Sequence, residues 1–348
     1  MIVEKISLQN FRNHKKAQFT FDNTTVIIGR NTVGKTNILE AIHILSHGKS
    51  FRAENDRDTI AQGHDFCRIE AQIKDNTDTK KLTVIFAERG AYLSKKFLIN
   101  NVARRHIDFA AQFFTVLFTP QDIEIITDSP SLRRNYINSI LSHASREYRQ
   151  ILNVYEKGLR QRNRMLYDLK DGRKEYKRAD FDYWDEILIR NGDYLTQKRE
   201  EFVKFINSSK KEMFDFKIFY DKSTISVERL FKYHFQEQAA GMTLVGPQRD
   251  DFIFRFPITE KRVSEFGSRG EERLTILQTK LLEIEYIKKE SGTNPVLLLD
   301  DIFSELDSEN IDKIYGFIKD QQTIITTTHK EFVPKKILKQ KGLAIIEL

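Results

Sequence analysis

Hydrophobic and polar positions follow three successive patterns along the chain, and each pattern predicts a different kind of structure. In residues 1–120, short β-branched and aromatic runs bounded by turn residues predict strands. One helix is expected after Gly34, where Ile38, Leu39, Ile42 and Leu45 recur at helical spacing. The expected strands span residues 2–8, 25–28, 67–73, 82–87, 96–99 and 113–118.

A helical pattern begins at Ser131 and holds two apolar stripes. The first runs from Tyr136 to Leu159 and the second from Trp184 to Ile206, both with i, i+3, i+4 spacing. Between them lies the polar and basic stretch 171–180. The stripes predict two helices of about 35 residues, each about 50 Å long at 1.5 Å rise per residue, joined by a basic tip.

The third pattern alternates helix and strand. Helical spacing returns at residues 274–284, and buried strand-like runs follow at 296–299, 323–326 and 343–348. Such alternation predicts a parallel sheet. The whole chain is therefore expected to be an α/β protein, with two lobes of one head at 1–130 and 241–348 and a helical arm at 131–240 inserted between them.

The 348 residues include one cysteine, Cys67, so no internal disulfide can form. No apolar run has the length of a membrane span, and the N-terminus lacks the apolar stretch of a signal peptide. We therefore expect a cytoplasmic protein without a membrane partner.

The net charge of +7 is concentrated in residues 133–178, which hold 13 Lys/Arg against five Asp/Glu. A local excess of this kind favours a polyanion such as DNA, although a solvated helix face is the alternative. The candidate DNA-binding residues are Arg133, Arg134, Arg160, Arg162, Arg164, Arg173, Lys174, Lys177 and Arg178.

The segment from Gly29 to Thr36 fits G-x-x-x-x-G-K-[ST]. It follows a strand-like run and opens a helix, which is the context of a phosphate-binding P-loop. In such a loop the backbone N–H groups hold phosphates, Lys35 reaches the β- and γ-phosphates, and the Thr36 hydroxyl binds Mg²⁺. We therefore expect ATP and Mg²⁺ as cofactors. The candidate nucleotide-binding residues in this segment are Gly29, Arg30, Asn31, Thr32, Val33, Gly34, Lys35 and Thr36.

An acidic pair, Asp300 and Asp301, ends the buried run 296–299. Beside a P-loop, Asp300 is the expected Mg²⁺ ligand and Asp301 the expected general base for the attacking water. Because the P-loop lies near the other end of the sequence, folding must bring the two motifs together around the inserted arm.

These motifs, with residues 304–307 and 326–329, resemble the ABC-type ATPases of the SMC group. The resemblance implies a D-loop at Ser304, Glu305 and Asp307 that crosses to a partner subunit. It implies a catalytic switch histidine at His329, for which a structural histidine is the alternative. It also implies a glutamine at Gln121 that reaches Mg²⁺ through water.

Six further blocks, at 11–14, 49–52, 118–122, 129–134, 246–251 and 267–273, resemble the RecF family of recombination mediators. The resemblance implies an ATP-driven homodimer, in which Ser268 and Gly270 of one subunit close the ATP site of the other. It implies a weak, DNA-stimulated ATPase that acts as a binding switch and clamps double-stranded or gapped DNA. The role implied is recombinational repair and replication-fork maintenance, with RecR as a partner and with RecO and RecA as indirect ones.

The chain departs from the family's pattern at a few positions. Glu271 and Glu272 stand where the family has glutamines, and their charges would weaken ATP-driven dimerisation unless they point away. Gln248 replaces a histidine, and Thr32-Val33 is an unusual loop centre. Two other functions are conceivable: an ATPase head that controls a nuclease or toxin partner in defence, and a structural chromosome-binding head, which would need long coiled coils.

Overall fold

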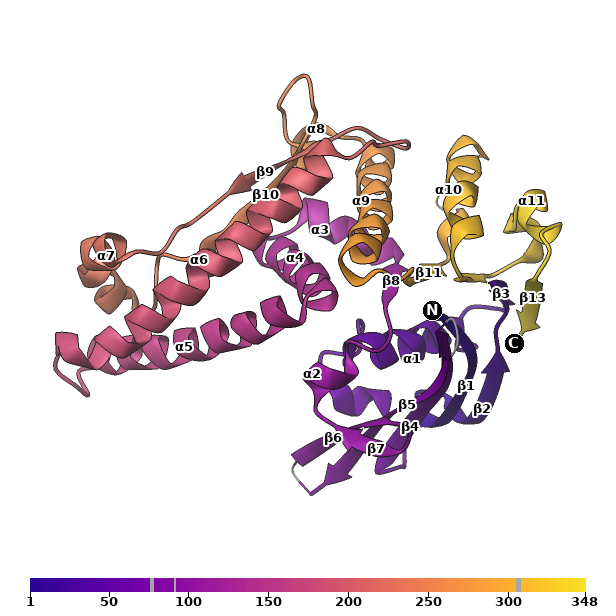
Figure 1. Ribbon diagram of the computed structural model, residues 1–348, viewed down its shortest axis with the longest axis horizontal. Helices are drawn as coiled ribbons and strands as arrows, with labels where there is room; N and C mark the ends of the chain where they lie inside the picture. The colour runs from indigo at the N-terminus through magenta and orange to yellow at the C-terminus, as the bar shows by residue number, and fades with distance from the viewer. Residues whose placement is uncertain (76–77, 91, 305–307) are drawn as a thin grey trace. The chain divides into compact units, whose positions relative to one another are not determined.

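The computed structural model describes residues 1–75, 78–90, 92–304 and 308–348 (Figure 1). Its contacts divide the chain into two compact units. Residues 1–122 and 277–348 form one, called the head unit here, and residues 123–276 form the other, called the arm unit. In the described part of the chain, no helix is long and apolar enough to cross a membrane.

The head unit contains a five-stranded parallel sheet. Its four strands other than β13 are buried almost throughout, as strands of a parallel sheet covered on both faces are, and β11 and β12 are wholly buried. The edge strand β13 is partly exposed. In sheet order the strands are β13 (Leu343–Glu347), β3 (Thr24–Ile28), β12 (Thr323–Thr327), β11 (Val296–Asp300) and β8 (Thr115–Phe118).

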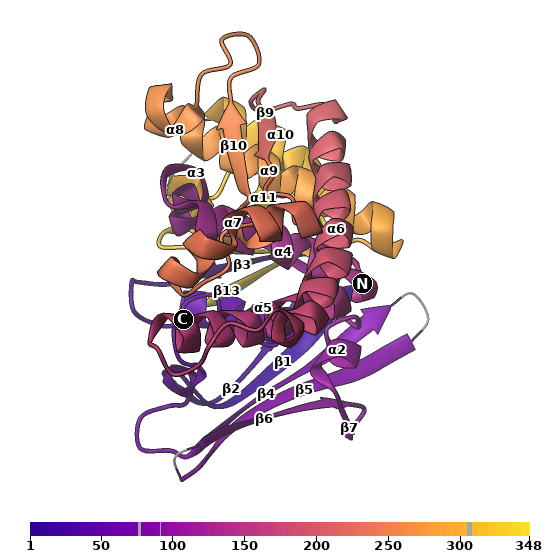
Figure 2. The same cartoon turned by 90° about the vertical axis from the view of Figure 1, so that its left-hand side faces the viewer.

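A six-stranded antiparallel sheet forms the second layer of the head unit (Figure 2). Its apolar face, with Ile6, Ile69 and Phe86 fully buried, shares one core with helix α1 (Lys35–His47). α1 contacts strands of both sheets, so the helix that follows the P-loop is held between them. In sheet order the strands are β2 (His14–Thr20), β1 (Ile2–Phe11), β4 (Phe66–Asp75), β5 (Asp78–Arg89), β6 (Tyr92–Ile99) and β7 (Val102–Arg104).

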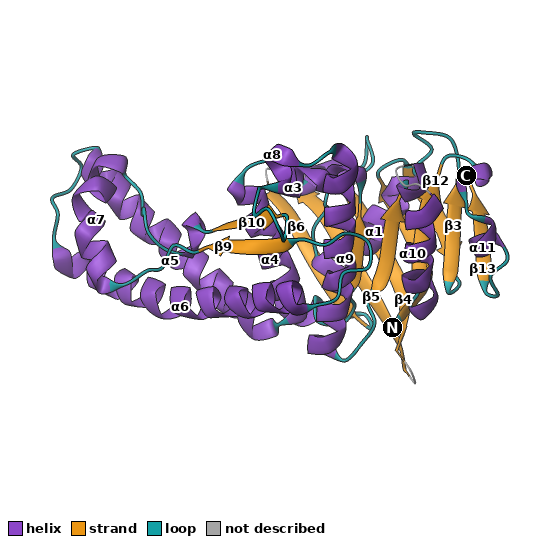
Figure 3. Cartoon of the chain, turned by 90° about the horizontal axis from the view of Figure 1, so that it is seen from above, coloured by secondary structure: helices purple, strands orange, loops and turns teal. Residues whose placement is uncertain are grey.

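The arm unit is built on two packed helices, α5 (Arg146–Lys170) and α6 (Arg178–Ser208), with α7 (Val227–Ala240) against the end where they are joined (Figures 1 and 3). Within α6, Gly192 permits close packing against Ile225, because a Cβ at position 192 would lie 2.6 Å from Ile225 Cγ2. The remaining main elements are α4 (Pro130–Ala144), β9 (Lys217–Asp221) and β10 (Asp251–Arg255).

Shorter elements complete both units. In the head unit they are η1 (Asp56–Thr59), α2 (His106–Phe109), η4 (Ile302–Ser304), α10 (Ser308–Asp320), η5 (Lys330–Phe332) and α11 (Lys335–Leu338). In the arm unit they are α3 (Glu124–Thr127), η3 (Pro247–Arg249) and α8 (Val263–Phe266). Two elements span the division between the units: η2 (Pro120–Ile123) and α9 (Arg269–Ser291).

The first predicted arm helix is interrupted. Ser145 has extended backbone angles and its side chain accepts a hydrogen bond from the Tyr148 N–H, so it ends α4 and caps α5. The arm helices are therefore 25 and 31 residues long, shorter than predicted. The division between the units also falls at 122 and 276 instead of 130 and 240. The arm unit extends beyond residue 240 because it includes β10, which pairs with β9.

Candidate functional site

The P-loop connects β3 to α1 at the carboxyl end of the parallel sheet. The Gly29 N–H donates to the Thr327 carbonyl at 3.3 Å, which ties the loop to the neighbouring strand β12. Thr32 (φ 75°) and Gly34 (φ 107°) take left-handed conformations. α1 starts without a side-chain cap and without an acid in its first turn. Its unpaired N–H groups and its positive dipole end therefore suit an anion.

The β1–β2 turn supports the loop from one side. Asn13 Nδ2 donates to the Val33 carbonyl at 2.9 Å, and its Oδ1 accepts from Asn37 Nδ2 at 2.8 Å. A Cβ on Gly34 would lie 2.6 Å from Asn13 Oδ1 and 2.8 Å from His14 Nε2. Asn13 and Asn37 are therefore positioning residues that sequence reasoning missed; the block at 11–14 was the only signal.

Lys35 is the first residue of α1, and its ammonium is held inside the loop. Its Nζ donates to the carbonyls of Gly29 at 2.7 Å and Arg30 at 3.0 Å, and only 8% of the residue is exposed. Burial lowers the pKa of Lys35, and the negative charges of Asp301 and Asp300 oppose this shift. The Lys35 amino group therefore lies at the centre of the loop, between two backbone carbonyls.

Thr36 and Asp300 meet although they are 264 residues apart. The Thr36 hydroxyl lies 3.0 Å from each carboxylate oxygen of Asp300, and Thr326 Oγ1 donates to Asp300 Oδ1 at 2.6 Å. A hydroxyl beside a carboxylate is the all-oxygen donor set that Mg²⁺ prefers. These residues therefore fit the expected metal. Gln121 is exposed in η2, just after β8, the strand beside β11.

Asp301 and His329 follow neighbouring strands of the same sheet. Asp301 turns the chain after β11 with a φ of 50°, and its N–H donates to Thr326 Oγ1 at 3.1 Å. His329 lies just after β12 and is exposed, with its ring packed edge-on to Phe332. Of the expected D-loop, Glu305 and Asp307 lie outside the described residues, and Ser304 ends η4.

Ser268 and Gly270, the residues expected to close the ATP site of a partner subunit, lie in the arm unit, where Ser268 caps α9. The Ser268 N–H and hydroxyl both donate to Glu271 Oε2, at 2.8 and 3.0 Å, and the Glu271 N–H lies 3.3 Å from Ser268 Oγ. This is a reciprocal capping box. Gly270 is the second residue of the helix. The Glu271 carboxylate therefore points toward Ser268 and not away from it. Burial raises the pKa of Glu272.

The structure divides the candidate DNA-binding cations into two groups. Arg162 is buried and forms ion pairs with Asp185 at 2.7 Å and Glu237 at 2.8 Å. Arg133 is paired with Asp251 at 2.7 Å, and Arg134 donates to the Asp250 carbonyl. These three arginines hold the arm unit together. The exposed cations of the set are Arg160, Arg164, Arg173, Lys174, Lys177 and Arg178.

Replacing Arg162 with leucine is expected to lower the free energy of unfolding by about 3 kcal/mol, because it removes the nearest cation of the buried Asp185 and Glu237 carboxylates. Arg164→Leu is the matched control, since Arg164 is exposed on the same helix, and its effect should stay within about 0.5 kcal/mol. Urea denaturation measures both. Equal effects of the two substitutions would contradict the structural role of Arg162.

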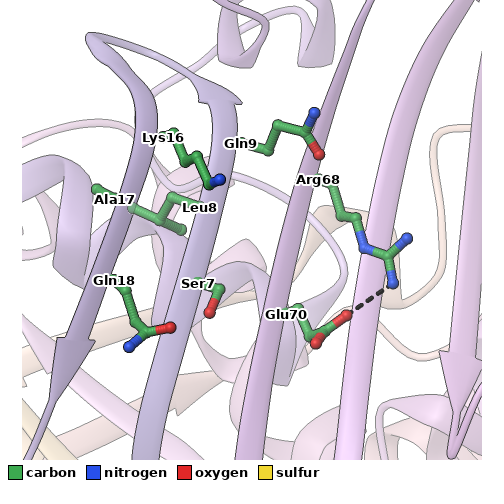
Figure 4. A pocket seen from close by; sticks show the side chains of 8 residues that line it. All are labelled: Ser7, Leu8, Gln9, Lys16, Ala17, Gln18, Arg68 and Glu70. Atoms are coloured by element: carbon green, nitrogen blue, oxygen red, sulfur yellow. Dashed lines mark hydrogen bonds and ion pairs between the residues drawn. The ribbon is translucent and has the colours of Figure 1, made fainter.

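A hollow of about 510 Å³ lies on the antiparallel sheet, away from this chemistry (Figure 4). It includes side chains of β1, β2 and β4, among them Arg68, which is paired with Glu70 at 2.7 Å. It shares no residue with the P-loop or with Asp300. The hollow is therefore separate from the P-loop and from Asp300.

Comparisons with known proteins agree with the geometry. Residues 2–345 match the family described as RecF/RecN/SMC N terminal domain. The chain is 31% identical to the DNA replication and repair proteins RecF of Bacillus thuringiensis (strain Al Hakam) and Bacillus cereus (strain AH187), over 98% of this chain and 95% of each relative.

Two solved structures of the recombination mediator protein RecF in the RecFOR pathway are also similar. The structure with ATPrS has a TM-score of 0.88 and 28% identity, over 100% of this chain and 96% of that chain. The structure with ATP has a TM-score of 0.87 and 29% identity, over 95% and 93%. The predicted fold class, an α/β ABC-type P-loop ATPase head with an inserted helical arm, is confirmed. The chain belongs to the RecF family of DNA replication and repair proteins.

Proposed function

We propose that this protein is an ATP-dependent DNA-binding protein of recombinational repair and replication-fork maintenance, and that ATP binding and hydrolysis switch its hold on DNA. The observation that carries the proposal is the pairing of Thr36 with Asp300 beside the buried Lys35. An adjacent hydroxyl, carboxylate and ammonium at a helix N-terminus form a site for a nucleotide phosphate with its metal.

Each residue of this site has a separate role in the proposal. The N–H groups of residues 29–34 and the Lys35 ammonium bind the phosphates, while Thr36 and Asp300 hold Mg²⁺, with Gln121 acting through water. The metal, when bound, neutralises charge on the phosphate oxygens. Asp301 orients the attacking water and accepts its proton, and His329 contacts the γ-phosphate. Hydrolysis serves as a timer that resets the switch.

We infer that ATP joins two copies of the chain, with Ser268 and Gly270 of one copy closing the ATP site of the other. A helix N-terminus offers N–H groups and a favourable dipole to a phosphate presented from outside. In the isolated chain the Ser268 hydroxyl and N–H donate to Glu271. A phosphate must therefore displace this carboxylate, so Glu271 opposes dimerisation.

Glu271→Gln is expected to strengthen ATP-dependent dimerisation about threefold to tenfold, because it removes a negative charge at the phosphate position. Glutamine can still complete the capping box, so α9 keeps its N-terminus. Analytical ultracentrifugation over a range of protein concentrations measures the dimer dissociation constant. Glu290→Gln, an exposed change at the other end of α9, is the control. Weaker dimerisation of Glu271→Gln would show that the carboxylate assists the contact.

We propose that the dimer clamps double-stranded or gapped DNA through exposed cations of the arm, excluding the three that hold the arm unit together. RecR is the proposed direct partner, with RecO and RecA acting downstream, as the family's place in the RecFOR pathway implies. Phosphate contacts give affinity without sequence specificity, and this affinity falls steeply with salt.

Steady-state ATP hydrolysis, measured with and without duplex DNA in a salt series, tests this switch. We expect slow hydrolysis that duplex DNA stimulates, with the stimulation lost as the salt concentration rises. If duplex DNA leaves the rate of ATP hydrolysis unchanged at every salt concentration, hydrolysis is not coupled to DNA binding. This result would contradict the proposal.

A further inference from the structure

Helix α7 of the arm unit carries an unusual exposed stripe. Val227, Phe231 and Phe235 recur at every fourth position and are 54%, 66% and 72% exposed, while Leu230 and Glu237 are buried on the other side. A surface helix normally turns its aromatic residues toward the core. Large apolar side chains gathered on the outside mark an interaction site more often than chance.

The rings on α7 lie close together. The His234 ring centroid is 5.5 Å from that of Phe231, with the rings nearly parallel at 19°, and 3.7 Å from that of Phe235. Tyr176, from the segment that joins α5 to α6, has its ring centroid 6.2 Å from that of His234 and is 40% exposed. The stripe and the joining segment therefore form one aromatic surface.

Cations border this surface. Lys170 Nζ donates to the Ala240 carbonyl at 3.4 Å, which holds the end of α5 beside the end of α7. Residues 167–178 contain five Lys/Arg against three Asp/Glu. Lys174, Lys177 and Lys232 are exposed and form no ion pair with any residue that the structure describes. These lysines, which lie beside exposed aromatic rings, complement a polyanion that also carries planar aromatic groups.

We propose that this tip surface, made of Tyr176, Phe231 and Phe235 with Lys174, Lys177 and Lys232, binds single-stranded nucleic acid. Unpaired bases stack on the phenylalanine rings and their phosphates contact the lysines. A duplex keeps its bases stacked internally and needs only the charges. A protein partner fits less well, because lysine is depleted at the centre of protein interfaces. The inference rests on the proposed DNA-binding function and adds the single-stranded part of a gapped substrate.

The test compares the full-length protein with the double variant Phe231→Ala/Phe235→Ala, both in the presence of ATP and Mg²⁺. Fluorescence anisotropy measures binding to a labelled oligothymidylate of about 15 nucleotides and to a duplex of the same length. Phe266→Ala is the matched control, because Phe266 is also exposed in the arm unit and Lys261 Nζ lies 4.6 Å from its ring centroid. A 2-aminopurine placed in the oligonucleotide reports stacking through quenching of its fluorescence.

The double variant is expected to bind the oligonucleotide about 10-fold to 100-fold more weakly, to lose the 2-aminopurine quenching, and to bind the duplex as the wild type does. Unchanged oligonucleotide binding with intact duplex binding overturns the stacking proposal alone. A wild type that binds neither DNA overturns the proposed DNA-binding function as well. A change in the sedimentation of the DNA-free protein, without a change in oligonucleotide binding, assigns the stripe to a second copy of the chain and overturns the proposal.

Discussion

Lys35→Met is expected to weaken ATP binding about 1,000-fold, because it removes charge-assisted hydrogen bonds worth about 1.5–3 kcal/mol each. The ammonium is largely buried in the loop, where it donates to the carbonyls of Gly29 and Arg30. The charge is therefore held at the loop, and already partly desolvated, before a phosphate binds. Equilibrium binding of a fluorescent ATP analogue measures the loss.

Two controls keep this result interpretable. Lys16→Met removes an exposed lysine from β2 and should leave ATP binding unchanged. Thermal unfolding of Lys35→Met checks that the loop's lost hydrogen bonds do not unfold the head unit. ATP binding by a folded Lys35→Met protein at the wild-type affinity would rule out the P-loop as the nucleotide site.

Asp301→Asn is expected to lower the rate of ATP hydrolysis about 100-fold to 1,000-fold while ATP binding persists, because an amide cannot accept the proton of the attacking water. Its position supports the role, since Asp301 follows the metal-side Asp300 and its N–H is fixed by Thr326. Single-turnover hydrolysis and nucleotide binding, measured on the same preparation, separate the two effects.

Asp300→Asn provides the contrast. It alters the carboxylate that meets Thr36, so it should weaken Mg²⁺-dependent ATP binding itself. Asp320→Asn, at an exposed position at the end of α10, should change neither quantity. If Asp301→Asn hydrolyses ATP at the wild-type rate, the base is a different residue and Asp301 serves only to turn the chain.

The placement of the P-loop and of Asp300 could be predicted from the sequence because each motif is local. A P-loop is a continuous segment whose conformation follows from its glycines and its flanking strand and helix, so Lys35 and Thr36 could be assigned directly. Asp300 could be assigned from the sequence because the apolar run 296–299 predicts a buried strand. An acidic residue at the carboxyl end of such a strand lies at the edge of the sheet. The distant motifs meet because β12 pairs with both β3, which leads into the P-loop, and β11, which ends at Asp300.

Other features depend on contacts that no local pattern records. Arg162 looks like any other arm cation in the sequence, but its partners Asp185 and Glu237 come from two other helices. The stripe that predicted one long helix continues across Ser145, where a single extended residue breaks it. The strands β9 and β10 are short and distant in sequence, and only their pairing identifies them.

The orientation of helix α7 could not be predicted from the sequence either. Phe231 and Phe235 would be assigned to a core from their type, yet α7 packs on α5 through Leu230's side and leaves them exposed. The carboxylate of Glu271 could not be placed from the sequence either. Only the observed capping box shows that this carboxylate accepts hydrogen bonds from Ser268.

The most direct test of the ATP-driven switch is the molar mass in solution, measured by light scattering with and without ATP and Mg²⁺. The wild type is predicted to be a monomer alone and a dimer with ATP, and duplex DNA should associate with the dimer in a salt-sensitive way. Lys35→Met and Ser268→Arg should remain monomeric, and Asp301→Asn should prolong the dimer. A wild-type protein that binds ATP but remains a monomer and does not bind duplex DNA would contradict the proposed ATP-driven switch.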